Sequence, residues 1–163
     1  MVKNLDIGEA APDFVLPGDD GQSLSLGGLK GKTVVLYFYP KDDTSGCTAE
    51  AIAFNALRED FRAAGVVVIG VSPDSVASHA KFKRKHGLAL TLAADEGHAA
   101  LQAYGVWKEK SLYGRKYMGV ERTTAIVDPK GRIVRLWRKV KVPGHAEEAL
   151  AALEAARTAF ANH

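Results

Sequence analysis

The sequence predicts an α/β fold in which helices flank a central mixed β-sheet, and three observations support it. Residues 33–39 and 66–71 form two continuous apolar runs, rich in β-branched and aromatic residues, which is typical of strands buried on both faces. Between them, residues 46–64 carry apolar side chains at every fourth position, and Gly65 follows as a stop signal, which predicts one helix. Strand, helix and strand form a βαβ unit with a right-handed crossover.

Shorter patterns give the remaining elements. Glycine-separated apolar pieces within residues 12–31 predict a small N-terminal hairpin, which extends the central fold. Further helices are expected over residues 75–86, 97–104 and 145–160, and further strands over residues 91–93, 123–127 and 132–137. We therefore expect helices on both faces of the sheet, and a single domain over residues 1–163.

Length and composition narrow the class of protein. The 163 residues, 47% of them hydrophobic, are enough for one well-packed core. The single cysteine allows no internal disulfide, which is typical of a reducing compartment. No apolar run is long enough for a secretory signal or a membrane span. These features predict a soluble, cytoplasmic protein that does not bind membranes.

The charge pattern gives little evidence for an anionic partner. The net charge is +3, and the densest basic run, residues 81–86, directly precedes Gly87, where a helix would end. Cations there complement the negative end of the helix dipole, although an anion-binding role is the alternative. Aromatic residues do not interleave with these charges as they would on a nucleic-acid surface, so we expect no nucleic-acid partner.

Cys47 is the first candidate for chemistry. Residues 40–47 join the first buried strand to the first helix, and the crevice beyond a strand's carboxyl end is the usual ligand site of an open α/β sheet. In the first helical turn, unpaired backbone N–H groups and the positive end of the dipole favour a thiolate. A buried, inert cysteine is the alternative, and position alone does not separate the two interpretations.

A family resemblance favours the reactive cysteine. The spacing Pro40-x-x-x-Thr44-x-x-Cys47 matches the active-site motif of peroxiredoxins. The chain also resembles the peroxiredoxin Q, or bacterioferritin comigratory protein, branch over residues 37–50, 104–110 and 113–124. Because separated segments match one family, the resemblance is specific, and it extends over nearly the whole chain. It implies a thioredoxin-like fold and the reduction of peroxides.

The resemblance also implies a role for each site residue. Cys47 would be the peroxidatic cysteine, which attacks the peroxide oxygen–oxygen bond and becomes a sulfenic acid. Thr44 would hydrogen-bond the peroxide and the sulfur, and Pro40 would shield the sulfur from water. Arg122 would hold the thiolate and polarise the peroxide, with Glu50 orienting Arg122. The plainer alternatives are a strand-ending proline, a helix-capping threonine, a surface arginine and an acid favoured by the helix dipole.

Magnitudes indicate where the rate enhancement should arise. A free cysteine is only about 3% ionised at pH 7, so ionisation can raise the thiolate fraction by only about 30-fold. One preorganised donor that stabilises developing charge contributes about 10²- to 10³-fold in other enzymes. We therefore expect the larger effect from Arg122, the Thr44 hydroxyl and the Cys47 backbone N–H.

The sequence departs from the two-cysteine pattern of many branch members. In those, a resolving cysteine stands five residues after the first, where this chain has Ile52, or in the next helix, around Lys83. The resemblance therefore implies a one-cysteine variant that needs an external thiol. That thiol could be thioredoxin, glutaredoxin, glutathione or Cys47 of another chain, and the branch implies a monomer or weak homodimer.

Other functions have weaker support. The five histidines are dispersed, so we predict no metal, and no cofactor motif is present. Trp107, Tyr113 and Tyr117 could line an entrance for organic hydroperoxides or pack within a long insertion. A thiol-disulfide oxidoreductase would normally carry a second cysteine at position 44, and a cysteine hydrolase would need a histidine beside Cys47. A peroxide sensor or holdase chaperone on the same scaffold is a further alternative.

Overall fold

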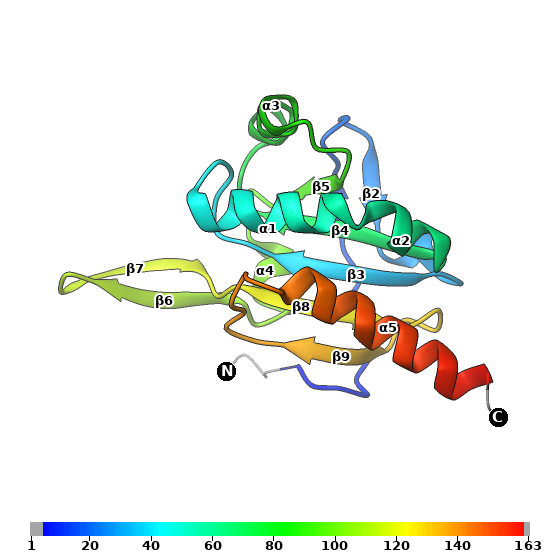
Figure 1. Ribbon diagram of the computed structural model, residues 1–163. Helices are drawn as coiled ribbons and strands as arrows, with labels where there is room; N and C mark the ends of the chain where they lie inside the picture. Colours follow the sequence, from blue (N-terminus) through cyan, green and yellow to red (C-terminus); the bar gives the residue numbers. More distant parts are fainter. Residues whose placement is uncertain (1–4, 162–163) are drawn as a thin grey trace.

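The computed structural model describes residues 5–161, with side chains through residue 155, and is built around a five-stranded mixed sheet (Figure 1). The strand order is β5-β4-β3-β8-β9, with β3, β4 and β5 parallel and β8 and β9 antiparallel to their neighbours. The strands are β3 (Thr33–Phe38), β4 (Val66–Ser72), β5 (Thr91–Ala94), β8 (Thr123–Val127) and β9 (Ile133–Trp137). The predicted mixed sheet is therefore confirmed.

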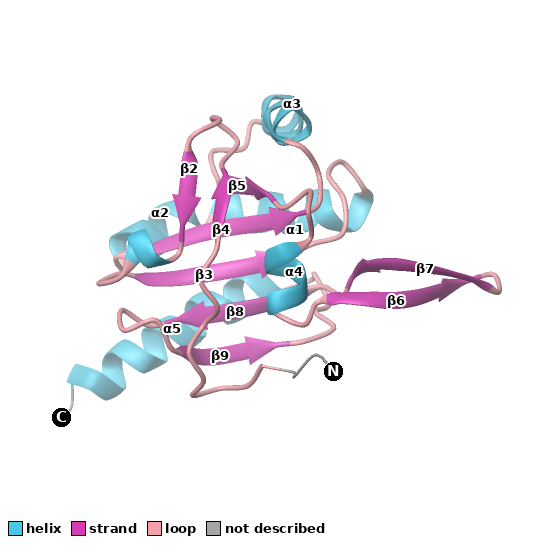
Figure 2. Cartoon of the chain, turned by 180° about the vertical axis from the view of Figure 1, so that it is seen from behind, coloured by secondary structure: helices cyan, strands magenta, loops and turns pink. Residues whose placement is uncertain are grey.

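Helices cover both faces of this sheet. On one face lie α1 (Ser45–Ala56), α2 (Arg58–Ala63) and α5 (His145–Ala161) (Figure 1). The short α4 (Ala99–Ala103) lies on the opposite face (Figure 2), and α3 (Val76–His86) packs at the β5 edge. The side chains of β3 alternate between two buried clusters, with Tyr37 facing α1 and Phe38 facing α4. This burial on both faces explains the continuous apolar run of the strand.

The single helix predicted over residues 46–64 is in fact two. Leu57 leaves helical geometry, with φ −99° and ψ 7°, and separates α1 from α2. The Arg58 guanidinium donates to the Asn55 carbonyl oxygen at 2.9 Å, which satisfies a carbonyl at the end of α1. Apolar periodicity continues across this break because α1 and α2 bury their residues in the same core.

The predicted N-terminal hairpin is present as β1 (Val15–Pro17) and β2 (Ser23–Ser25), followed by a short 3₁₀ turn, η1 (Gly27–Leu29). Asp19 in its loop accepts hydrogen bonds from the Leu92 backbone at 2.9 Å and the Lys83 ammonium at 2.8 Å. These bonds tie the hairpin to β5 and α3, so the extension is packed onto the central fold.

A second hairpin was not predicted. Strands β6 (Trp107–Leu112) and β7 (Arg115–Val120) pair antiparallel and project away from the sheet (Figures 1 and 2). Tyr113 lies at its tip and is 96% exposed, so it neither packs in an insertion nor lines an entrance. Trp107 at the base stacks on His98, with ring centroids 3.9 Å apart, and thus has the packing role. Tyr117 lies between these extremes, half exposed on β7.

Within residues 5–161, no helix has both the length and the apolar character needed to cross a membrane.

Candidate active site

The site begins where β3 ends. The chain leaves β3 at Phe38, turns through residues 39–44 and enters α1, for which Thr44 is the N-cap residue with φ −91° and ψ 156°. The first hydrogen bond of the helix runs from the Thr48 N–H to the Thr44 carbonyl at 2.8 Å. Cys47 therefore lies in the first turn, where backbone N–H groups have no acceptor within the helix. Its side chain is only 2% exposed.

Arg122 reaches Cys47 because of the register between two strands. Strand β8 runs antiparallel to β3, and Phe38 at the end of β3 pairs with Thr123 at the start of β8. This pairing places Arg122 beside the loop that leads to Cys47. Its Nη2 donates to the Cys47 Sγ at 3.3 Å, a contact between residues 75 positions apart. The guanidinium also passes Gly46 so closely that a Cβ there would lie 3.2 Å from Nη2.

Glu50 holds the other side of this guanidinium. It lies one helical turn after Cys47, is 1% exposed, and its Oε1 accepts a hydrogen bond from Arg122 Nη1 at 2.6 Å. Its Oε2 is buried without a hydrogen-bond partner among the described residues. Burial accordingly raises the pKa of Glu50 to about 7, although Arg122 acts in the opposite direction. The predicted contacts of Arg122 with both Cys47 and Glu50 are present.

The ionisation of Arg122 is supported by its neighbours. Burial by itself would favour the neutral guanidine, but the negative charges of Glu50 and Cys47 outweigh it, and the pKa of Arg122 is raised. Because one guanidinium bonds two different groups, its plane and its charge are both fixed at the sulfur.

Thr44 and Pro40 complete the predicted set. The Thr44 hydroxyl donates to the Lys41 carbonyl oxygen at 2.8 Å, so its single proton is already engaged. Although Thr44 occupies the N-cap position, its side chain makes no capping hydrogen bond. Pro40 is half-buried in the same loop, directly after the last buried residues of β3. Ile52, where a resolving cysteine would stand in many relatives, is 48% exposed on α1.

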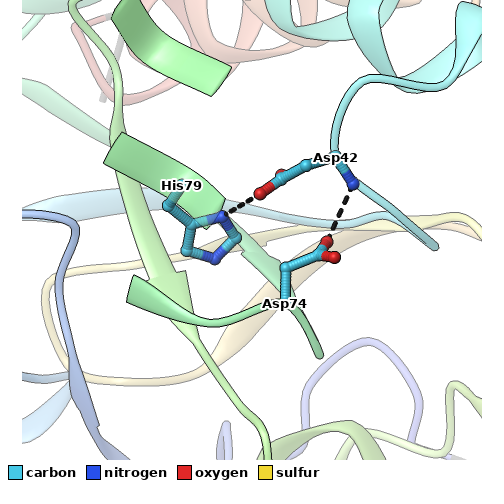
Figure 3. A group of neighbouring side chains, drawn as sticks. All are labelled: Asp42, Asp74 and His79. Atoms are coloured by element: carbon cyan, nitrogen blue, oxygen red, sulfur yellow. Dashed lines mark hydrogen bonds and ion pairs between the residues drawn. The ribbon is translucent and has the colours of Figure 1, made fainter. Parts of the chain in front are cut away.

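Two features near the site escaped sequence reasoning. Lys110 on β6 is half-buried, and burial together with the nearby charge of Arg122 lowers its pKa. The family resemblance covers Lys110 at the end of residues 104–110 but implies no role for it, and the hairpin that carries it was not predicted. The second feature is a group formed by Asp42, Asp74 and His79, whose ligand-type atoms lie within 4.8 Å of one another (Figure 3). Asp42 lies 32 positions before Asp74, so no local spacing in the sequence links it to Asp74 and His79.

Comparison with known proteins agrees with this geometry. The model of the AhpC/TSA family matches residues 7–136. Peroxiredoxin Bcp of Bacillus subtilis is 49% identical over 150 residues, covering 92% of this chain and 96% of that protein. Peroxiredoxin Bcp of Xanthomonas campestris is 46% identical over 151 residues, covering 93% and 94%.

Solved structures show the same fold. Bacterioferritin comigratory protein of Xanthomonas campestris superposes with a TM-score of 0.85 at 45% identity, covering 93% of this chain and 96% of that one. A cysteine-to-serine mutant of Xylella fastidiosa PrxQ gives a TM-score of 0.90 at 38% identity, covering 95% and 99%. The predicted thioredoxin-like peroxiredoxin fold is thus confirmed. The chain belongs to the AhpC/TSA family and is a peroxiredoxin of the Bcp, or PrxQ, branch.

Proposed function

We propose that Cys47 is the nucleophile with which this peroxiredoxin reduces hydrogen peroxide and organic hydroperoxides. The observation that carries the proposal is the Arg122 guanidinium, which lies 3.3 Å from the sulfur and is fixed by Glu50 at 2.6 Å. A cation in that position stabilises the thiolate and also faces the charge that develops on the peroxide oxygens. Xanthomonas campestris bacterioferritin comigratory protein, which this chain resembles, reduces alkyl peroxides.

In the first half of the cycle, the Cys47 thiolate attacks the terminal oxygen of the hydroperoxide. The oxygen–oxygen bond breaks, the sulfur becomes a sulfenic acid, and the departing alkoxide or hydroxide takes up a proton to leave as alcohol or water. Arg122 and the Cys47 backbone N–H are the donors that stabilise this charge. Each such donor is worth about 10²- to 10³-fold when preorganised.

The proposed role of Thr44 is narrower than the family motif alone implies. Its hydroxyl proton is given to the Lys41 carbonyl, which leaves the oxygen free to accept. The terminal oxygen of a hydroperoxide carries the only O–H that every substrate of this class shares. Thr44 therefore accepts that hydrogen and holds the terminal oxygen for attack, while Pro40 limits the access of water to the sulfur.

In the second half, an external thiol attacks the sulfenic acid, releasing water and forming a mixed disulfide. A second thiol then frees the Cys47 thiolate and leaves as disulfide. This chain has one cysteine. Xanthomonas campestris peroxiredoxin Q has at least two, because solved structures carry a serine in place of one cysteine or of another. The thiols to test are thioredoxin, glutaredoxin and glutathione, the reductants of a reducing cytoplasm. The chain is expected to be a monomer or a weak homodimer.

Peroxide consumption with excess dithiothreitol tests this proposal. The native chain should turn over many equivalents of peroxide, and Cys47→Ser should turn over none. Mass spectrometry after one equivalent of peroxide should show one added oxygen on Cys47. A Cys47→Ser variant that kept the native rate would refute the assignment, and a native chain that reacted only once would identify a sensor instead.

A further inference from the structure

Asp42, two residues before Thr44, is a buried carboxylate that the chemistry above does not use. It is 7% exposed, and three donors converge on it. The Tyr39 hydroxyl donates to its Oδ1 at 2.7 Å, while the Ser78 hydroxyl and the His79 ring contact its Oδ2 at 2.8 Å and 2.7 Å. Because hydrogen-bond partners lie at both oxygens, the position of this carboxyl group is fixed from three directions.

His79 is one of the buried hydrogen-bond partners of this carboxyl group. Its side chain is fully buried, and its Nδ1 lies at Asp42 (Figure 3). Its Nε2 lies 3.0 Å from the Ala93 carbonyl oxygen. Each ring nitrogen therefore faces an oxygen atom at hydrogen-bonding distance, and both are engaged within the protein. The two residues thus form a buried hydrogen-bonded pair that joins the loop after β3 to α3 and β5.

Hydrogen bonds within the protein already engage the polar atoms of Asp42, Asp74 and His79. Asp74 lies close enough to share an ion with them, but both ring nitrogens of His79 already contact oxygen atoms of the protein. Asp74 itself accepts the Asp42 backbone N–H at 2.8 Å and the Ser72 hydroxyl at 2.7 Å. The group is therefore a hydrogen-bonded anchor, in which the backbone and the side chain of Asp42 are both held.

The anchor acts on the part of the chain that positions the reacting groups. Asp42 lies between Lys41, whose carbonyl accepts the Thr44 proton, and Asp43, whose φ of +61° starts the sharp turn into α1. Asp43 is also tied to α3, through Lys85 at 2.6 Å and His86 at 2.8 Å, but these contacts are exposed and solvent screening weakens them. The buried Asp42 pair is thus the stronger constraint on the loop.

We propose that Asp42 and His79 are positioning residues for peroxide reduction, because their buried pair sets where Thr44 and the first turn of α1 lie relative to Arg122. This inference rests on the proposed function of Cys47. Neither residue touches the reacting atoms. Their effect is to prevent the loop from adopting positions in which the Thr44 oxygen and the Cys47 N–H miss the peroxide.

Asp42→Asn is the first test. The amide keeps only one acceptor oxygen, and its NH₂ group replaces the other oxygen, so donor would face donor on that side. Two rate constants are measured, for sulfenic acid formation with hydrogen peroxide and for alkylation of Cys47 by iodoacetamide. Alkylation reports the reactivity of the sulfur but does not use the peroxide-binding donors. We expect the peroxide rate constant to fall about 10- to 100-fold, as small misplacements of reacting groups do, while alkylation changes less than about threefold.

Two variants serve as matched controls. Asp19→Asn removes a carboxylate that also accepts a backbone N–H from β5 and a donor from α3, but whose bonds do not go to the loop. Asp43→Asn weakens the exposed attachment of the same loop. Both should keep the peroxide rate constant within about threefold of the native value.

Milder variants cover the case in which Asp42→Asn does not fold. Tyr39→Phe and Ser78→Ala each delete one donor to Asp42 and keep the rest of the anchor, so each should lower the peroxide rate constant more than the alkylation rate constant. The inference is overturned if folded variants react with peroxide at the native rate, or if both rate constants fall in parallel. If instead Cys47→Ser consumed peroxide normally, the proposed function itself would fail.

Discussion

Replacing Glu50 by glutamine should change how the stability of the protein depends on pH. Burial raises the pKa of Glu50 from its ordinary 4.5 to about 7, even though Arg122 lies 2.6 Å away. In the unfolded chain, Glu50 loses its proton near pH 4.5, whereas in the folded chain it keeps the proton to about pH 7. Between these values the folded state binds more protons, so the free energy of unfolding falls as pH rises.

The size of the effect follows from the same two values. A difference of about 2.5 pKa units corresponds to about 3 kcal/mol, of which about 2.5 kcal/mol lies between pH 5 and pH 8. Because Glu50 is 1% exposed, solvent screening removes little of it. Glutamine has the same shape but does not ionise, so Glu50→Gln should be less stable relative to the native chain at pH 5 than at pH 8.

Urea unfolding of the native chain and of Glu50→Gln, at pH 5 and pH 8, gives the required double difference. Glu147→Gln, on the exposed surface of α5, is the control and should show the native dependence. The reasoning is refuted if Glu50→Gln shows the native slope, or if the difference has the opposite sign. The opposite sign would mean that attraction to Arg122 exceeds the cost of burying the carboxylate, as for an ordinary salt-bridged acid.

Three further substitutions test other parts of the structure. Arg122→Lys should lower the rate constant for sulfenic acid formation about 10²- to 10³-fold, because one ammonium cannot bond both Glu50 and the sulfur as the two-pronged guanidinium does. A loss of rate no larger than the loss of ionised Cys47, followed by thiolate absorbance, would contradict this. Gly70→Ala should destabilise the protein by about 1–3 kcal/mol in urea unfolding, since its Cβ would lie 2.6 Å from the Tyr37 ring; native stability would show that the ring moves freely. Ile52→Cys should allow the sulfenic acid to form an internal disulfide, which mass spectrometry detects. Helical positions five residues apart are too distant for a disulfide, so α1 must first unwind. A sulfenic acid that persists would show that α1 stays helical.

Local patterns were sufficient for most of the sheet. The runs at residues 33–39 and 66–71 predicted β3 and β4, because a strand buried on both faces is apolar at nearly every position. The hairpin β6–β7 was missed for the opposite reason. It is largely exposed and carries charged residues on both faces, so it shows no apolar alternation. Its one signal was the Tyr113–Gly114 pair, whose φ values of 52° and 77° suit a tight two-residue turn.

The candidate site divides in a similar way. Cys47 could be placed in a first helical turn from the pattern alone, but its pairing with Arg122 and Glu50 came from the family resemblance. No local rule predicts that residues 75 positions apart will meet. That contact depends on the antiparallel register of β8 with β3, which is a property of the assembled sheet.

The direction of a hydrogen bond lies beyond what a motif can specify. The sequence indicates that a threonine stands three residues before Cys47, and the motif suggests a contact with peroxide, but a hydroxyl can either donate or accept. In the folded loop the Thr44 proton goes to the Lys41 carbonyl, whose position depends on the turn that Asp42 and His79 anchor. In the proposed site, the polarity of Thr44, and with it the orientation of the bound peroxide, thus depends on the buried Asp42–His79 contact outside the motif's named residues. The same motif on a loosened loop would retain every named residue and still lose this orientation.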